Sequence, residues 1–121
     1  MEGSPAALKR RTKQFALDVL RFVSTEQPTE QTRNIRQQLI RSATSVGANY
    51  RSACRSRSRA EFIAKVGVTL EEADEAAFWL EILLEGEFTT QQSARVLLSE
   101  ANELCAILAA SALTARANRP V

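Results

Sequence analysis

The sequence predicts an all-α protein, an antiparallel up-down-up-down four-helix bundle, and three observations lead to this class. Glycine and proline are scarce, at 4 and 3 of 121 residues, so little interrupts helix formation. Apolar residues recur at steps of three and four in four long segments, without the alternation of strands. Short connections between these segments favour antiparallel neighbours. We expect a single domain over residues 1–121.

Helix one is expected over residues 5–25. Ser4 is a suitable N-cap, and Pro5 takes the first helical position, where its missing N–H removes no helical hydrogen bond. One apolar stripe follows the helical period along the whole segment. Its members are Leu8, Thr12, Phe15, Val19 and Phe22.

Helix two is expected over residues 30–54 and begins near Thr29. Gly47 stands in its middle, where a glycine costs roughly 1 kcal/mol relative to alanine. Either another helix approaches closely at Gly47 or the glycine is simply tolerated, and the sequence leaves both explanations open. The inward stripe is Ile35, Leu39, Ala43, Val46, Tyr50 and either Ala53 or Cys54.

Helix three is expected over residues 59–85. Ser58 and Glu61 have the spacing of a capping box, in which the serine accepts from the glutamate N–H and the glutamate side chain reaches back. Gly86 follows as the expected C′ residue. The inward stripe is Phe62, Val66, Leu70, Ala73, Ala77, Leu80 and Leu84.

Helix four is expected over residues 90–115, after a second capping-box candidate at residues 89–92. We expect the C-terminal residues "TARANRPV" to fray. The inward stripe is Ala94, Leu97, Ala101, Leu104, Leu108 and Ala112.

The outer side of helix three is unusually apolar. A helical wheel places Trp79 almost opposite the stripe, Phe78 and Ile82 on one flank, and Leu83 on the other. A large exposed apolar patch normally marks an interface, and tryptophan and phenylalanine are enriched in interfaces. We therefore predict that Phe78, Trp79, Ile82 and Leu83 form an oligomer interface. In the alternative reading, Trp79 and Phe78 lie under loops of their own chain.

Charge is divided sharply along the chain although the net charge is only +2. Residues 33–60 contain seven arginines and no acid, whereas residues 61–87 contain eight acids and one lysine. In one explanation the basic helix two and the acidic helix three form ion pairs, which set register more than stability. In the other explanation, part of the arginine set stays unpaired and binds phosphate.

The stretch "YRSACRSRSR" carries the nucleic-acid hypothesis. Its arginines lie at the junction of helices two and three. Apart from Glu61, the acids of helix three begin at Glu71, more than two turns further along. Ser56 and Ser58 also offer hydroxyls to phosphate oxygens. A solvated or ion-paired corner remains the alternative, and Arg33, Arg36 and Arg41 are expected to form structural pairs. The predicted nucleic-acid-binding residues are Arg51, Arg55, Arg57 and Arg59.

Catalytic and metal chemistry find little support in the residues. Histidine is absent, which excludes histidine-based triads and histidine metal ligands. Glu71, Asp74 and Glu75 could ligate a hard cation, although a solvated acidic face is the more ordinary reading. We expect no enzyme activity, no metal and no cofactor. Without a secretory signal or a long apolar run, we expect a cytoplasmic protein with reduced cysteines and no membrane partner.

A family resemblance rests on the segments "RSATSVGANYR" and "SRAEFI". They resemble the Ser-(Ile/Val)-x-x-Asn and Ser-x-x-Glu-Phe motifs of the proteins encoded by intervening sequences in ribosomal RNA genes. This family includes the accessory variability protein of diversity-generating retroelements. Ser52 and Ala53 replace the family's usual acidic-glycine pair, and the tryptophan often found early in helix one is missing.

The resemblance implies a ring-shaped homopentamer without known catalytic residues. In the retroelement branch it further implies contact with nucleic acid through basic surface, beside a reverse transcriptase. Together with the residue patterns, it leads us to expect a non-enzymatic bundle that binds RNA, DNA or a nucleoprotein without sequence preference. The alternative is a structural protein–protein scaffold that binds no nucleic acid.

Overall fold

The protein folds into four helices, as seen in a computed structural model that describes residues 3–118. They are α1 (Pro5–Thr25), α2 (Glu30–Cys54), α3 (Arg59–Glu85) and α4 (Gln92–Ala117). The all-α prediction is confirmed, since no strand occurs in the described part of the chain. The expected ranges of the first three helices coincide with these bounds. Helix α4 begins two residues later than expected and continues to Ala117, so the first four residues of the tail expected to fray are helical.

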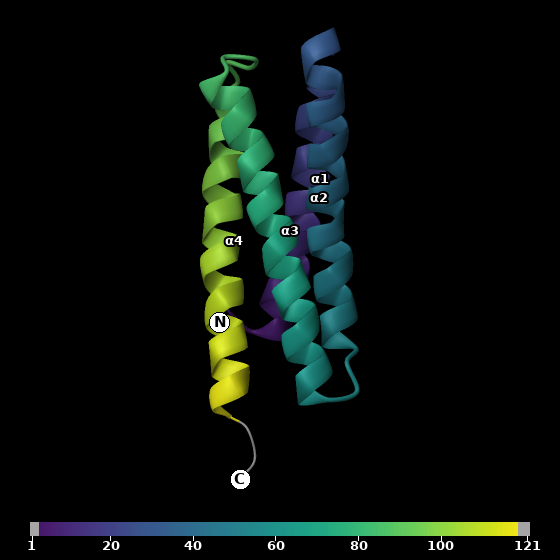
Figure 1. Cartoon of the computed structure of the whole chain (residues 1–121), viewed down its shortest axis with the longest axis vertical. Coiled ribbons are helices and arrows are strands. Elements are labelled where there is room, and N and C mark those ends of the chain that lie inside the picture. Colours follow the sequence, from purple (N-terminus) through teal and green to yellow (C-terminus); the bar gives the residue numbers. More distant parts are fainter. Residues whose placement is uncertain (1–2, 119–121) are drawn as a thin grey trace.

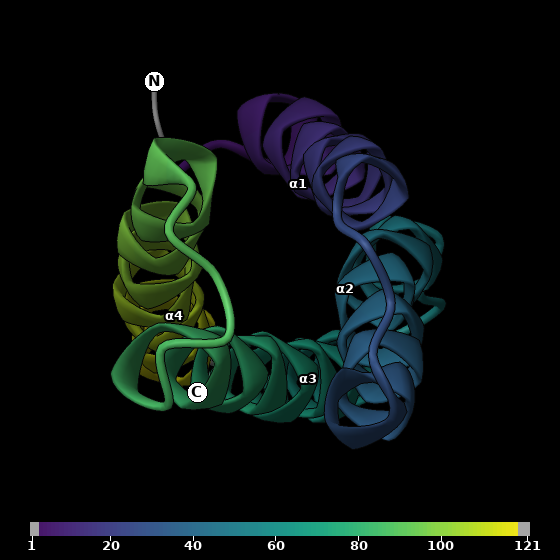
Figure 2. The ribbon, with the colours of Figure 1, turned by 90° about the horizontal axis from the view of Figure 1, so that it is seen from above.

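The helices lie along a common long axis and surround one apolar core (Figure 1). Viewed along that axis, α1, α2, α3 and α4 follow one another around a square (Figure 2). Contacts are most numerous between helices that are consecutive in the sequence, and among the pairs that touch, α1 and α4 have the fewest. The bundle is therefore tightly joined on three sides and more open on the fourth.

Side chains cap the starts of α1, α2 and α3, and the capping differs from expectation at three points. Ser4 accepts from the Ala7 N–H at 3.2 Å, as predicted. The unpredicted reciprocal capping box lies at the start of α2, where Thr29 and Thr32 satisfy each other's backbone N–H. At the start of α3, Ser58 accepts from the Glu61 N–H, but Glu61 reaches back to the N–H of Arg57 instead. Helix α4 begins without a side-chain cap, so the second capping box is absent.

Two glycines mark close approaches. A Cβ at Gly47 would lie 3.4 Å from the Thr12 carbonyl oxygen, so α1 passes directly against this point of α2. The expected approach is present, but it does not require glycine, because a Cβ at this distance makes an ordinary van der Waals contact. A Cβ at Gly86 would lie 2.5 Å from the ring of Phe88, which folds back over it. Gly86 itself is right-handed helical, and the left-handed position belongs to Glu87, with φ 59°.

The core matches the predicted stripes of α1 and α4 completely. All five stripe residues of α1 and all six of α4 are buried. In α2, Ala53 is buried and Cys54 is exposed, which resolves that alternative, while Ile35 is only partly buried. Helix α3 differs most, because its buried face is rotated away from Leu70 and Leu84, which are partly buried. That face consists of Val66, Thr69, Ala73, Ala76, Ala77, Leu80 and Leu83.

Helix α4 is also long and apolar enough to cross a membrane by length and composition alone. Its alanine and leucine stripe nevertheless packs into the bundle core. Helices buried in the core of other globular proteins have a similar composition. Exposed Val96 and Leu113 add to its apolar character.

Candidate nucleic-acid interface

The four predicted phosphate-binding arginines lie together where α2 ends and α3 begins, and we call this group the arginine corner. Arg51 lies in the last turn of α2, Arg55 is its C-cap, Arg57 is in the connection, and Arg59 opens α3. All four are exposed. Within residues 3–118, none of their side chains forms an ion pair or a hydrogen bond.

Backbone contacts hold the corner in place while its guanidinium groups stay free. The N–H groups of Arg55 and Ser56 donate to the carbonyls of Ser52 and Ala53 at 3.0 Å. The Ser58 hydroxyl oxygen caps α3. Ser56 differs from expectation, because its hydroxyl oxygen is buried and finds no partner in the described part of the chain, so it does not face a phosphate.

The acid nearest in sequence to the corner is neutralised by a lysine. The Glu61 carboxylate lies 3.1 Å from the Lys65 ammonium. Hydrogen bonding from Lys65, and then from the Arg57 N–H, lowers the pKa of Glu61. Lys65 also donates to the Ser52 hydroxyl at 2.8 Å. Because Glu61 is engaged locally, the arginine corner keeps its positive charge.

The expected pairing of basic α2 with acidic α3 occurs further along the helices. Arg41 bonds to Glu72 at 3.0 Å and also to Glu75, whose hydrogen bond is the main cause that raises the pKa of Arg41. Arg36 is structural in another way, since it donates to the Val23 and Glu26 carbonyls at the end of α1. Arg33 is exposed and has no ion pair among the described residues, so the expectation of a structural pair is wrong for it.

The four predicted interface residues of α3 separate in the structure. Phe78 is 49% exposed, and its ring meets Trp79 edge-to-face at 4.9 Å. Trp79 packs partly against the core, and its indole N–H donates to Glu75 at 3.4 Å. Ile82 is half-buried, whereas Leu83 is 4% exposed and belongs to the core. The expectation that Leu83 faces outward is therefore wrong.

The error at Leu83 comes from the even apolar character of α3. A wheel centred on Leu70 and Leu84 places Leu83 on a flank, but Ala76, Leu80 and Leu83 together define the true inward direction. Alanines at 73, 76 and 77 allow close packing without standing out in a hydrophobicity pattern. Val68, which is 44% exposed, was missed by sequence reasoning and is a second exposed apolar side chain on α3.

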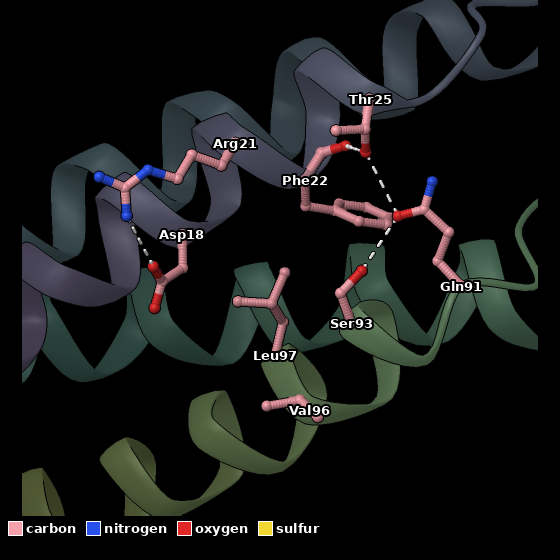
Figure 3. Close-up of a pocket in the computed structure, with 8 residues that line it drawn as sticks. All are labelled: Asp18, Arg21, Phe22, Thr25, Gln91, Ser93, Val96 and Leu97. Carbon is pink, nitrogen blue, oxygen red and sulfur yellow. Dashed lines mark hydrogen bonds and ion pairs between the residues drawn. The ribbon is translucent and has the colours of Figure 1, made fainter.

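An open pocket of about 400 Å³ lies between the end of α1 and the start of α4 (Figure 3). Phe22, Val96 and Leu97 give it apolar walls. Its polar groups are bonded to one another: Arg21 pairs with Asp18, and the Thr25 and Ser93 hydroxyls donate to the side-chain amide oxygen of Gln91. The pocket thus presents apolar surface and no free reactive group.

The described residues form neither a metal site nor a reactive thiol site. No three His, Cys, Asp or Glu side chains converge there to hold a metal, and Glu75 bonds to Arg41 and Trp79. The cysteines are both free thiols, Cys54 exposed and Cys105 half-buried. Burial raises the pKa of Cys105 to about 11, which makes its thiol a poor nucleophile at neutral pH.

Comparisons with known proteins agree on one family. The model of the family described as 23S rRNA-intervening sequence protein matches residues 7–110. Among solved structures, the chain is similar to a protein of unknown function from the S23 ribosomal protein family of Bacteroides thetaiotaomicron. The two are 27% identical, the match covers 90% of this chain and 97% of that chain, and the TM-score is 0.78. A search of curated proteins found no match.

Proposed function

This chain belongs to the 23S rRNA-intervening sequence protein family, and on that premise we propose that it is a non-enzymatic bundle that binds nucleic acid or a nucleoprotein. The arginine corner is the observation that supports this most. Its four guanidinium groups are exposed and have no ion pair among residues 3–118. Unpaired positive charges at this density attract phosphate groups and release counterions when they bind them.

Binding of this kind carries no sequence preference. Contacts to phosphate position a protein on nucleic acid, whereas contacts to base edges specify the sequence. The arginine corner holds arginine and serine but no aromatic side chain on which a base could stack. Affinity should therefore depend on ionic strength far more than on sequence.

The experiment compares two charge-reversal pairs in binding to a labelled single-stranded oligonucleotide. Arg55→Glu with Arg57→Glu should abolish binding at about 50 mM salt, while helix content is unchanged because both side chains are exposed. Arg33→Glu with Arg95→Glu is the matched control, since these arginines are equally exposed and lie outside the corner. For six to ten phosphate contacts, wild-type affinity should fall roughly 10³- to 10⁵-fold by 200 mM salt. Undetectable wild-type binding at low salt would end the proposal.

The second part of the proposal is self-association: we propose that up-down-up-down four-helix bundles assemble into a ring-shaped homopentamer, as the resemblance implies. Two exposed apolar side chains of α3, Phe78 and Val68, together with half-buried Ile82, support an interface on this helix. The antiparallel order is supported by Lys9, near the start of α1, sharing a groove with Arg51, near the end of α2. Each copy would bring one arginine corner, so assembly multiplies a weak patch.

The alternative function is a protein–protein scaffold, and the same resemblance implies a reverse transcriptase as its partner. The exposed apolar face of α3 favours it, because such faces bind protein more often than nucleic acid. Light scattering measures the mass of the assembly, and the oligonucleotide assay measures binding. A protein that assembles but binds no oligonucleotide at low salt fits only the scaffold. A wild-type mass near 13.4 kDa would instead contradict self-association.

A further inference from the structure

A second basic feature lies beside the arginine corner, in a groove between α1 and α2. The groove has a volume of about 380 Å³. Lys9 and Lys13 line it from α1, and Thr44, Ala48 and Arg51 line it from α2. Gly47 forms its floor, where the backbone of α1 passes within van der Waals reach. None of the residues that line the groove is acidic.

The helical period explains why these cations face one another. Lys9 and Lys13 are four residues apart, so their Cβ atoms lie about 6 Å from each other on one side of α1. On α2, the spacing of Thr44, Gly47 and Arg51 likewise directs one side toward α1. Gly47 lies against the α1 backbone in this groove, where a Cβ would meet the Thr12 carbonyl oxygen at 3.4 Å.

The charges in the groove are unbalanced. Lys9, Lys13 and Arg51 are exposed, and none has an ion pair among residues 3–118. The groove between α1 and α4 is different, since Arg11 there is bonded to Glu100 and Glu103. Three cations without an acid favour an anion over an ordinary solvated surface.

The groove continues into the arginine corner through Arg51, which belongs to both. The connection between α2 and α3 and the start of α1 lie toward the same end of the bundle (Figure 1). A negatively charged chain could therefore contact the corner and the groove at once.

We propose that the α1–α2 groove binds the phosphodiester backbone of a nucleic acid and extends the arginine corner onto α1. This inference rests on the proposed function and adds Lys9 and Lys13 as phosphate ligands. The Thr44 hydroxyl already donates to the Ile40 carbonyl at 2.8 Å, so the contacts are those of the cations. The groove is lined by no aromatic side chain, which makes phosphate rather than base its ligand.

The first test removes the lysine charges. Lys9→Gln with Lys13→Gln should weaken binding of a labelled single-stranded oligonucleotide roughly tenfold or more at 50 mM salt, equally for every base sequence. The slope of log affinity against log salt should fall by about 0.7–0.9 for each lysine. Arg33→Gln with Arg95→Gln removes the same charge from exposed sites elsewhere and should change little.

The second test places a carboxylate in the groove. Ala48 is exposed and lines the groove, so Ala48→Glu should reduce oligonucleotide binding, whereas the isosteric Ala48→Gln should not. Circular dichroism of each variant checks the fold. Competition with inorganic phosphate and with pyrophosphate separates a polymer ligand from a free anion, because a polymer that also holds the corner resists millimolar phosphate.

The outcomes distinguish this inference from the proposed function. Loss of binding in Arg55→Glu/Arg57→Glu but wild-type affinity in Lys9→Gln/Lys13→Gln would overturn the groove and leave the corner. Wild-type protein that binds no oligonucleotide would overturn both. Groove variants that bind oligonucleotides normally but lose binding to anionic vesicles would also overturn it, in favour of a lipid headgroup.

Discussion

Individual glycines in this protein have opposite roles. Gly86 is required because the Phe88 ring folds over it, with ring atoms 2.5 Å from where a Cβ would lie. Gly67 stands inside α3 with open space around its Cβ position. One glycine therefore makes a contact possible, while the other only weakens its helix.

Alanine at these two positions should shift stability in opposite directions. Gly86→Ala should lower the free energy of unfolding by about 1 kcal/mol, because the Phe88 ring must move. Gly67→Ala should raise it by about 0.5–1 kcal/mol, since alanine restricts the unfolded chain and favours helix. Urea unfolding of both variants measures the effects. Equal signs would show that the ring contact is unimportant, or that Gly67 is covered by another molecule.

The two cysteines should differ in reactivity. At pH 8 a thiol reagent should modify exposed Cys54 rapidly and Cys105 slowly, because burial holds the pKa of Cys105 at about 11. The same shift destabilises the fold at high pH: above about pH 9 the unfolded thiol ionises while the folded one stays protonated. Thiol titration of Cys54→Ser and Cys105→Ser variants assigns the two rates, and rapid modification of Cys105 would contradict its burial.

At the scale of elements, Arg36 ties the end of α1 to α2. Its guanidinium donates to the Glu26 carbonyl at 2.9 Å and the Val23 carbonyl at 2.7 Å. These carbonyls lie at the C-terminal end of a helix, where intrahelical donors run out. The arginine thus acts as a cap supplied by a neighbouring helix.

Replacing this cap should destabilise the bundle. Arg36→Met should cost about 1–3 kcal/mol, because two carbonyls lose a charged donor. Arg33→Met, one turn earlier, should change stability by less than about 0.5 kcal/mol, since that side chain is exposed. Thermal unfolding of the two variants provides the comparison. Similar melting temperatures would mean that water replaces the Arg36 contacts without loss.

Elements also differ in how well the sequence alone predicts them. The stripe of α1 is flanked mostly by polar residues, so its period identifies the buried face correctly. The stripe of α4 is also predicted correctly, although exposed Val96 and Leu113 make that helix apolar on other sides too. Helix α3 is apolar nearly all around, so the period cannot orient it, and Leu83 was misplaced. The capping box of α2 was missed because Thr32, rather than glutamate or glutamine, closes it.

In the candidate site, too, the features formed within one segment could be predicted, whereas those formed by two helices could not. The arginine corner lies apart in sequence from the acids that begin at Glu71, and Lys65 pairs with the nearer Glu61. The groove requires α1 to approach Gly47, which joins residues some forty positions apart. The signals present in the sequence were the Lys9–Lys13 spacing and the mid-helix glycine, but neither identifies its partner helix.

At the scale of the whole molecule, the proposed assembly should be visible in thermal stability. If a second copy covers Phe78, Tm should rise with protein concentration, because mass action favours the bound, folded state. Phe78→Glu should remove this dependence, while Leu113→Glu on α4 should preserve it; both side chains are exposed in one chain. Calorimetry measures Tm over a roughly hundredfold range of protein concentration. A wild-type Tm independent of concentration would contradict an α3 interface.

The order of the helices around the square has a kinetic consequence. Most contacts join helices that are consecutive in the sequence, and few join α1 to α4. The mean sequence separation of contacting residues, which is the contact order, is therefore low. Such topologies fold in microseconds to milliseconds. The first two helices carry both the Gly47 approach and the lysine-lined groove, so this half of the molecule can begin to assemble while the ribosome is still synthesising the rest.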